Sequence, residues 1–368
     1  MSRGASDVDS SALASSEGGG GGIAIDDRKT IFRYDSPFLS SSGGIHDDDR
    51  RRSSSALVVL NTPIRSRGWD GSGASDVDGD MTRDGALYGT VLGVLWGASA
   101  YRVCADGGAN RLYDATVAVL RGGDDDGEAE EDSCDSNHHR DFDFLPDLIT
   151  GDLDSLRPGV RRYYESRGVP ILRVEDQDYH DLDVRIKSLM AVEKWFERAS
   201  PRAKSSEGGE SHEGVVASKS MTYIYGGFGG RFDQEMGVIN ALCVWGKKET
   251  FQRTTLVAYD EQTCAVVLPE SPMRSEIVIR FPGVSSSEDE EEMHRACRVG
   301  EGPTCGLIPI MGRCDRVVTT GLQWNLDGDV PLEFGGLVSS SNRVVNPVVT
   351  VESSSPLLFT AEITVKHE

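Results

Sequence analysis

The feature that most constrains the fold is a change of pattern near residue 250. From SALVVLNTPI (55 to 64) onward, short apolar runs such as YRVCAD, FLPDLIT, VPILRV and MTYIYGG alternate with helical patterns. That alternation favours a parallel sheet covered by helices. After residue 250 the chain shows short strand-like runs separated by turn residues, from TTLVAYD to LLFTAEITV. This second pattern favours an antiparallel sandwich or barrel.

The same patterns set the expected organisation of the chain. We expect an α/β domain over 30–250, with one helix within 84–99, and an all-β domain over 251–368. Residues 1–29 are mainly Ser, Gly and Asp with few large apolar groups, so we expect this tail to be disordered. Polar inserts interrupt the ordered pattern, and we interpret them as solvated loops: 121–143, 199–219 and 284–296.

Composition excludes several classes of function. The formal net charge of −22 opposes a nucleic-acid-binding surface, so an anionic ligand needs a metal or a local basic spot. Seven cysteines without a CxxC pair indicate neither a disulfide framework nor a zinc ribbon, and they fit a reducing compartment. The most apolar segment, 89–100, is too short and glycine-rich to span a bilayer, and the N-terminus lacks a signal-peptide core. We therefore expect a cytoplasmic protein with no membrane or nucleic-acid partner.

Four polar clusters follow strand-like runs of the α/β region. They are CADGGANRLYD (104–114), GDLDSL (151–156), EDQDYHDLD (175–183) and YGGFGGRFDQEMGVIN (225–240). Any one of them is more simply a turn or a helix cap, because Asp and Gly are ordinary there. In an open α/β sheet, however, the carboxyl ends of parallel strands share one edge, where ligands bind. The clusters together therefore predict a common site.

Carboxylates gathered at such an edge repel one another unless a cation lies between them. Mg²⁺ takes carboxylate oxygens while leaving positions for substrate phosphates, so Asp152 and Asp154 are expected metal ligands on a tight turn. The glycine pair after Asp106 lets backbone N–H groups approach a ligand. GGFGG matches neither the dinucleotide fingerprint nor the Walker A pattern, so an oxidoreductase lacks its expected motif.

Seven motifs, in order, resemble those of the eukaryotic thiamine pyrophosphokinases: CADGGANRLYD, PDLITGDLDSL, DQDYHD, GGFGGRFDQ, CGLIPI, VTTGLQWNL and LVSSSN. The resemblance covers roughly residues 55 to 365 apart from the inserts. It implies a Rossmann-like α/β catalytic domain followed by a β-sandwich, in a homodimer with active sites at the subunit interface. The implied reaction converts ATP and thiamine into AMP and thiamine diphosphate, with Mg²⁺ as cofactor and ATP as co-substrate.

The resemblance also implies roles for individual residues. The implied Mg²⁺ ligands and catalytic residues are Asp106, Asp152, Asp154 and Asp181. The implied nucleotide-binding residues are Gly107, Gly108, Gln177, Gly227, Arg231, Asp233 and Gln234. Trp324 of the partner subunit would stack on thiamine, with Ser341 and Asn342 nearby. An aromatic face suits the cationic thiazolium ring, although a lone Trp in a β domain is more often a core residue.

Some roles stay open at this level. The family usually has Thr-Asp followed closely by a lysine, whereas this chain has His180-Asp181, with Arg185 and Lys187 displaced along the next helix. The aspartates do not reveal which of them acts as a general base. The alternative function is a thiamine- or nucleotide-binding homologue without turnover, but a mere binder gains nothing from so many carboxylates beside a triphosphate.

Overall fold

The computed structural model describes residues 31–38, 55–64, 90–117, 144–174, 184–199, 220–245, 254–271, 274–279 and 299–365. The expected disordered tail, 1–29, and the inserts at 121–143 and 284–296 lie outside these ranges. The insert at 199–219 lies outside them except for its first residue, which ends a helix. None of the helices in the described ranges is long and apolar enough to cross a membrane.

Six parallel strands form the first part of the sheet. In spatial order they run β7-β6-β2-β3-β4-β5. Their bounds are β2 Ala56–Val59, β3 Tyr101–Ala105, β4 Leu148–Gly151, β5 Ile171–Arg173, β6 Ser220–Tyr225 and β7 Thr254–Tyr259. Strands β2, β4 and β7 are buried along their whole length, because other elements of the fold cover both faces, and this explains their continuous apolar runs.

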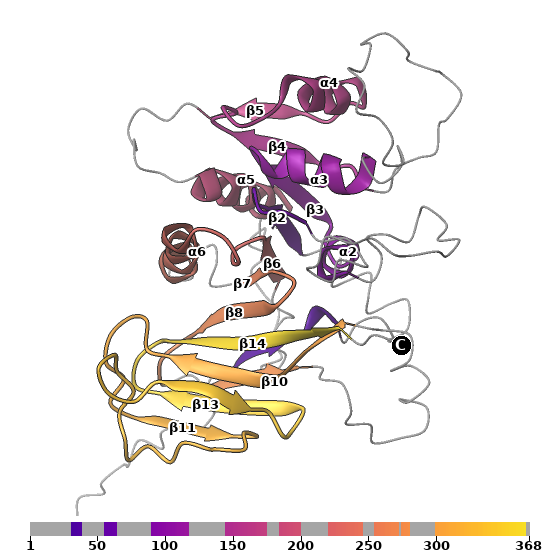
Figure 1. The fold of residues 1–368 in the computed structure, drawn as a ribbon. Helices are drawn as coiled ribbons and strands as arrows, with labels where there is room; N and C mark the ends of the chain where they lie inside the picture. Colours follow the sequence, from indigo (N-terminus) through magenta and orange to yellow (C-terminus); the bar gives the residue numbers. More distant parts are fainter. Residues whose placement is uncertain are drawn as a thin grey trace, which may run out of the picture.

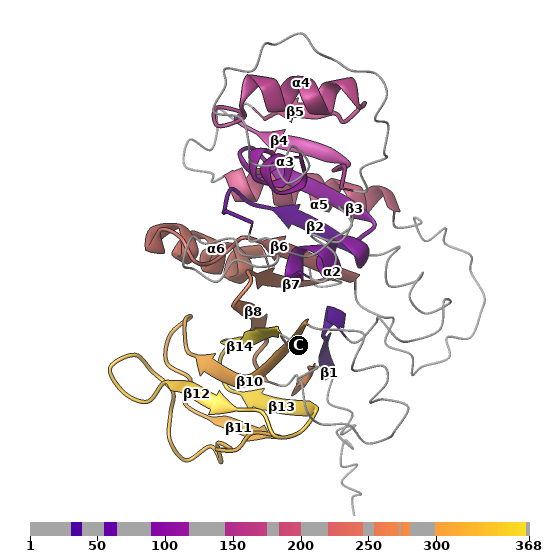
Figure 2. The same ribbon diagram turned by 45° about the vertical axis from the view of Figure 1, so that its right-hand side comes forward.

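The helices divide between the two faces of this parallel region. Along β2, Leu57 and Val59 join one buried apolar cluster, whereas Ala56 and Val58 join the other, as the two-residue period of a strand requires. The first cluster takes in α2 (Val91–Gly97), α3 (Gly108–Val117) and α4 (Pro158–Ser166). The second takes in α5 (Val184–Ala199) and α6 (Phe232–Trp245). Figures 1 and 2 show the two groups on opposite sides of the strands.

The sheet does not end at the change of pattern. The sequence pattern assigned TTLVAYD to the antiparallel region, but β7 pairs in parallel with β6 and in antiparallel with β8. The described strands therefore form one ten-stranded sheet, which continues from β7 through β8 Thr263–Leu268, β14 Leu357–Val365, β10 Val299–Ile308 and β12 Ser339–Arg343. The sequence of β7 does not indicate the direction of its neighbours, because a fully buried strand has the same apolar pattern beside a parallel or an antiparallel strand.

A second sheet of four strands packs against the antiparallel end. Its order is β1 Ile31–Asp35, β9 Arg274–Val278, β13 Val348–Ser353 and β11 Val317–Thr320. Side chains of both sheets, including Phe359 and Val349, share one apolar cluster. Strand β1 falls within the range 30–250 expected for the α/β domain, yet it pairs in parallel with β9 of this second sheet. The N-terminal strand thus lies beside a strand more than 200 positions later in the sequence.

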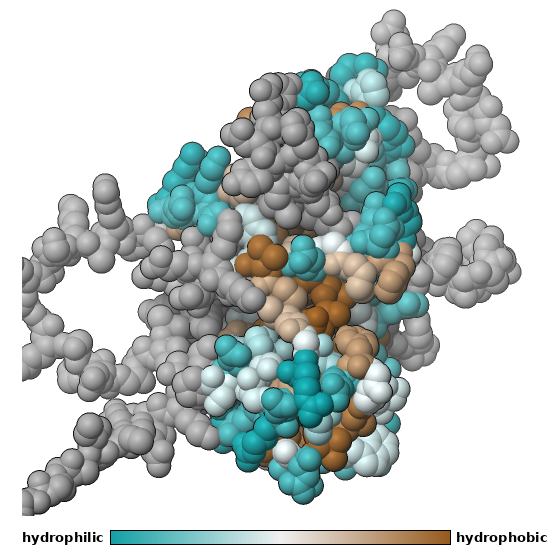
Figure 3. Space-filling model, turned by 90° about the vertical axis from the view of Figure 1, so that its left-hand side faces the viewer, coloured by the Kyte–Doolittle hydropathy of each residue, from teal (hydrophilic) through white to brown (hydrophobic). Residues whose placement is uncertain are grey.

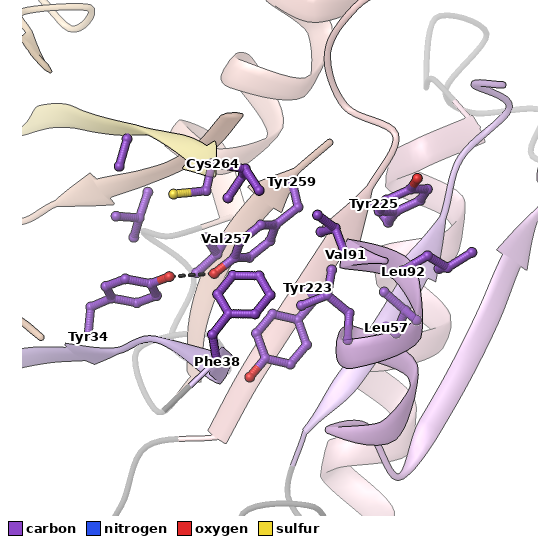
Figure 4. Packing of buried hydrophobic residues seen from close by; sticks show 14 of the residues in the cluster. Tyr34, Phe38, Leu57, Val91, Leu92, Tyr223, Tyr225, Val257, Tyr259 and Cys264 are labelled. Atoms are coloured by element: carbon purple, nitrogen blue, oxygen red, sulfur yellow. Dashed lines mark hydrogen bonds between the residues drawn. The ribbon is translucent and has the colours of Figure 1, made fainter. Parts of the chain in front are cut away.

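A buried polar cluster joins the three parts of the fold. Tyr34 of β1, Tyr259 of β7 and Glu301 of β10 are each fully buried. The Tyr259 hydroxyl donates to Glu301 Oε1 at 2.8 Å, the Tyr34 hydroxyl donates to the same oxygen, and the two hydroxyls also contact each other. Figure 4 shows Tyr34 and Tyr259 facing one another, with Phe38 and Cys264 close by. Burial raises the pKa of Glu301 to about 7, although the tyrosine hydroxyls oppose the shift.

Replacing Glu301 by Gln should flatten the dependence of stability on pH. The folded-state pKa of about 7 exceeds the ordinary value of 4.5, so the folded state binds a proton more tightly than the unfolded state between those values. Wild-type stability should therefore fall as pH rises from about 4.5 to about 7 and level off above that, by on the order of a few kcal/mol. Melting temperatures across this range test the expectation. As a control, Glu165→Gln changes an exposed residue of α4 and should keep the wild-type slope of stability against pH. A wild-type slope in Glu301→Gln would contradict the prediction.

Candidate functional site

Four loops at the carboxyl edge of the parallel strands enclose a cavity of about 250 Å³. The chain advances from β2 to β5 on one side of β2 and then returns as β6 on its other side, so a topological switch point lies between β2 and β6. The cavity is lined by Leu60, Asn61, Thr62, Ala105, Asp106, Gly107, Asp152, Asp154, Ser155, Gly226, Gly227, Phe228, Gly230, Arg231, Gln234 and Glu235.

Three of the aspartates predicted to bind metal meet in this cavity. Asp106, Asp152 and Asp154 each offer one carboxylate oxygen, and these oxygens lie within 4.8 Å of one another. Asp106 is buried, Asp152 is half-buried and Asp154 is exposed. Oδ1 of Asp106 and Oδ1 of Asp152 are buried without a hydrogen-bond partner in the part of the chain that the structure describes. Unpartnered buried carboxylate oxygens are costly, and a bound cation would satisfy them.

The turn after β4 explains the spacing of Asp152 and Asp154. Leu153 lies between them with a φ of 62°, a left-handed conformation that is rare for a branched residue. The Leu153 side chain packs against the apolar core, and Leu156 is buried as well. Leu153 therefore turns into the core between the two aspartates, while Asp152 and Asp154 both line the cavity. Asp106 also has a positive φ, of 44°, and backbone strain of this kind gathers at functional sites.

The surroundings of Asp106 and Asp154 shift their pKa values in opposite directions. Burial raises the pKa of Asp106 to about 6, and the charge of Asp152 adds to the rise. The Ser155 backbone N–H opposes it by donating to Asp106 Oδ2 at 3.3 Å. The Ser155 hydroxyl donates to Asp154 Oδ1 at 2.9 Å, which lowers the pKa of Asp154. Ser155 thus holds two of the three carboxylates, a role that the sequence analysis missed.

The two glycines after Asp106 allow the helix α3 to start close to β2. A Cβ at Gly108 would lie 2.3 Å from the Val59 carbonyl oxygen, and a Cβ at Gly107 would lie 2.4 Å from Asn61 Nδ2. Both distances are shorter than any side chain tolerates. Gly107 lines the cavity, whereas Gly108, predicted to bind the nucleotide, is outside the lining and packs on the β2 backbone.

Replacing Gly108 by Ala should therefore destabilise the protein by roughly 1–3 kcal/mol, the usual cost of overpacking. The obstructing atom belongs to the backbone of a central strand and cannot move aside. Chemical denaturation measures the loss. Gly159→Ala is the matched control, because nothing lies within 4 Å of a Cβ at this position of α4, and it should be neutral or stabilising. Equal stabilities of the two variants would show that the close approach is unimportant.

The glycine-rich loop after β6 forms the opposite wall. Gly226 and Gly229 have φ values of 84° and 80°, which favour glycine. Glu235 Oε1 accepts hydrogen bonds from the N–H groups of Gly229 and Gly230, at 3.0 and 3.2 Å, and so fixes the loop. Glu235 belongs to the first turn of α6 and was not predicted as a site residue.

The predicted residues of this loop have different places. Gly227, Arg231 and Gln234 line the cavity, but Asp233 does not. Asp233 instead forms an exposed ion pair with Arg231 at 2.6 Å, and this contact lowers the pKa of Asp233. The site therefore has an arginine at its rim whose fork is already oriented by a neighbouring carboxylate.

The predicted thiamine residues form a separate group in the antiparallel region. Asn342 is buried, donates from Nδ2 to the Trp324 carbonyl oxygen at 2.8 Å and accepts from the Trp324 N–H at 3.3 Å. Asn342 thus fixes the loop that carries Trp324. The Trp324 side chain itself is 58% exposed, so the alternative that it is a core residue is wrong. Ser341 is exposed, with a φ of 58°.

Two predicted site residues lie outside the described part of the chain, and two residues that line the cavity were not predicted. Gln177 and Asp181, together with His180, lie outside the described residues. The sequence analysis did not single out Asn61 or Thr62, although Thr62 Oγ1 donates to the Gly226 carbonyl oxygen at 2.6 Å and joins two loops of the cavity. The signal was present, because SALVVLNTPI ends in polar residues directly after the first strand of the α/β pattern.

A parallel sheet with a polar cavity at its switch point places the chain among the α/β proteins that bind ligands at the carboxyl edge. Comparison with known proteins narrows the class. The family model "Thiamin pyrophosphokinase, catalytic domain" matches residues 92–254, and "Thiamin pyrophosphokinase, vitamin B1 binding domain" matches residues 290–358. The chain belongs to the thiamine pyrophosphokinase family.

Individual relatives agree with the family models. Thiamine pyrophosphokinase 3 of Oryza sativa subsp. japonica is 32% identical over 74% of this chain and 82% of the relative. Thiamine pyrophosphokinase 1 of Arabidopsis thaliana is 33% identical over 77% of this chain and 89% of the relative. The solved structure of yeast thiamin pyrophosphokinase, 21% identical, covers 93% of each chain with a TM-score of 0.57. That of Candida albicans thiamin pyrophosphokinase, 24% identical, covers 85% of this chain and 90% of its own, with a TM-score of 0.56.

Proposed function

We propose that this protein is a Mg²⁺-dependent thiamine diphosphokinase. The thiamine hydroxyl oxygen attacks the β-phosphorus of ATP, the bond from that phosphorus to the α–β bridging oxygen breaks, and AMP leaves while the hydroxyl loses its proton. The observation that carries this proposal is the three-carboxylate cluster, with two unpartnered buried oxygens, in a chain of this family. Transfer of this kind needs positioning and charge neutralisation more than covalent work by the protein.

The residues divide the work as follows. Asp106, Asp152 and Asp154 would hold Mg²⁺, with Asp181, which lies outside the described residues, as a fourth proposed ligand. Bound Mg²⁺ would neutralise charge on the phosphate oxygens. Arg231 can donate to a phosphate from Nη1, because its Nε and Nη2 already donate to Asp233, and Gln234 lines the same wall. Gly107 and Gly227 leave backbone close to the ligand, while Gln177 and Asp233 complete the nucleotide region. Any of the three aspartates can accept the hydroxyl proton.

We further propose a division into two domains. The proposed bounds are residues 30–250 for a Rossmann-like catalytic domain and residues 251–368 for a β-sandwich domain that binds thiamine through Trp324, Ser341 and Asn342, except that β1 pairs with β9 of the second sheet and β7 continues the parallel strands. The family models support this, because the catalytic one ends at residue 254 and the vitamin B1-binding one lies within 290–358. An exposed indole on a fixed loop suits a cationic thiazolium ring.

The active unit in this proposal is a homodimer. The cavity lies at the ends of β2, β3, β4 and β6, whereas Asn342, which holds Trp324, lies on β12 at the far end of the same sheet, so a second copy would bring the two together. Large apolar side chains are available for such an interface, because Phe232, Trp324 and Phe334 are each more than half exposed. Figure 3 shows hydrophobic residues gathered in the middle of the side on which α6 lies, between hydrophilic regions.

The cytoplasm is the proposed location. In the part of the chain that the structure describes, the cysteines form no disulfide, which suits a reducing compartment; they are Cys104, Cys243, Cys264, Cys305 and Cys314.

An assay of AMP formation tests the function. Purified protein with ATP should release AMP only when thiamine and Mg²⁺ are both present, and thiamine diphosphate should appear in equal amount. AMP without thiamine would indicate another acceptor. Thiamine binding without any AMP would favour the non-catalytic homologue.

Asp152→Asn and Asp154→Asn should each lower kcat by on the order of 10²-fold or more while leaving the melting temperature close to that of the wild type. A neutral amide no longer offsets the charge of the metal, and the lost stabilisation falls on the transferring phosphoryl group. Steady-state AMP release measures the effect. Asp315→Asn removes an exposed carboxylate in a surface ion pair and should retain full activity. Near-normal rates in both cavity variants would remove these residues from the metal site.

Trp324→Ala should raise the KM for thiamine by roughly 2- to 30-fold, the range of a cation–π contact. The KM for ATP should stay close to the wild-type value, because Trp324 does not line the ATP cavity. Kinetics with each substrate varied in turn measures the two constants. Equal increases in both would indicate a structural role for the Trp324 loop.

A further inference from the structure

We propose that Asn61 contacts the substrate, donating hydrogen bonds from its side-chain amide to a phosphate oxygen of the nucleotide, and that Arg111 is the residue that positions it. This inference rests on the proposed function, because it assigns a further role within the same cavity.

The place of Asn61 in the fold is the first argument. Asn61 lies two residues after the end of β2, and β2 lies between β3 and β6 at the switch point of the parallel strands. Its side chain lies against the backbone of Gly107, with Nδ2 only 2.4 Å from where a Cβ would be. Gly107 is adjacent to the metal-type ligand Asp106, and all three residues line the cavity. Phosphates held at the aspartates therefore come within reach of Asn61.

The hydrogen bond from Arg111 fixes the direction of the amide. Arg111, on α3, donates from Nε to Asn61 Oδ1 at 2.9 Å. A guanidinium has donors and no acceptor, so only the oxygen of the amide can face it. The Nδ2 group, with two N–H donors, must then point away from Arg111. Among the described residues Asn61 Nδ2 makes no hydrogen bond, and the amide makes no bond to its own loop, which argues against an ordinary turn-forming role.

The charges around the cavity explain why such a donor is useful. Four carboxylates line it, from Asp106, Asp152, Asp154 and Glu235, and the arginine on the lining, Arg231, is already paired with Asp233. A triphosphate in this setting needs donors that the carboxylates do not capture. Within the described ranges Arg111 has no carboxylate at ion-pair distance, so no acidic side chain competes with Asn61 Oδ1 for its Nε donor.

Asn61→Asp tests the assignment with almost no change in shape. The new carboxylate can still accept from Arg111, so the loop contact is kept, but it can no longer donate into the cavity. We expect the KM for ATP to rise by roughly 10-fold or more and the KM for thiamine to change little. Asn240→Asp makes the same chemical change at an exposed position of α6 outside the cavity lining and should behave as the wild type.

A binding measurement separates phosphate recognition from other roles. By titration calorimetry with Mg²⁺ present, Asn61→Asp and Asn61→Ala should both weaken ADP binding several-fold while leaving adenosine binding unchanged. Equal weakening for adenosine and ADP, or no weakening for either, would overturn the proposal. The two proposals fail by different results. Absence of AMP release from the wild-type protein would contradict the proposed function, whereas the ADP and adenosine titrations test Asn61.

Arg111→Met tests the positioning role. It leaves the donor of Asn61 in place but releases its orientation, so the KM for ATP should rise less than in Asn61→Asp. Adding Arg111→Met to Asn61→Ala should then cause little further loss of ADP affinity, because Arg111 acts through Asn61. A full additional loss in the double variant would show that Arg111 binds phosphate by itself and would overturn the positioning role.

Discussion

The mutual repulsion of three carboxylates is the constraint on which the site depends. At a separation of 4.8 Å, two such charges oppose each other by roughly 3 kcal/mol at an effective dielectric constant of about 20. Burial of Asp106 adds a desolvation cost, which appears as its raised pKa. A fold tolerates this arrangement when a cation resolves it, and the unpartnered oxygens of Asp106 and Asp152 mark where a cation would bind. Substrate phosphates would then bind the same cation, and in this way a cavity lined by carboxylates can bind an anionic substrate.

Close backbone packing makes the convergence possible. Gly107 and Gly108 let α3 start against β2, and the left-handed residues Asp106 and Leu153 turn the chain sharply at the ends of two strands. The rigid sheet supports the strain of these turns. The same packing places Asn61 against Gly107 and within reach of Arg111. Gly107 therefore both follows Asp106 of the acidic cluster and leaves room for the Asn61 amide.

The two halves of the fold are physically continuous. Strand β7 carries the parallel sheet on into the antiparallel region, and the cluster of Tyr34, Tyr259 and Glu301 joins both to the N-terminal strand. A single hydrogen-bonded sheet transmits position better than a linker does. The location of the Trp324 loop relative to the cavity is therefore set within each chain, which is what the proposed homodimer needs.

The sequence by itself determined the alternation of strands and helices from residue 55 onward, the glycine-rich turns and the types of residue at the strand ends, because these follow from local periodicity and turn chemistry. It also identified Asp106, Asp152 and Asp154, since carboxylates after successive strands of one parallel sheet must share an edge. Tertiary structure alone decided the pairing of β1 with β9, the parallel partner of β7, the burial of Glu301 and the exposure of Trp324. Each of these depends on contacts between residues far apart in the chain, and no local pattern encodes which distant strand or side chain a residue will meet.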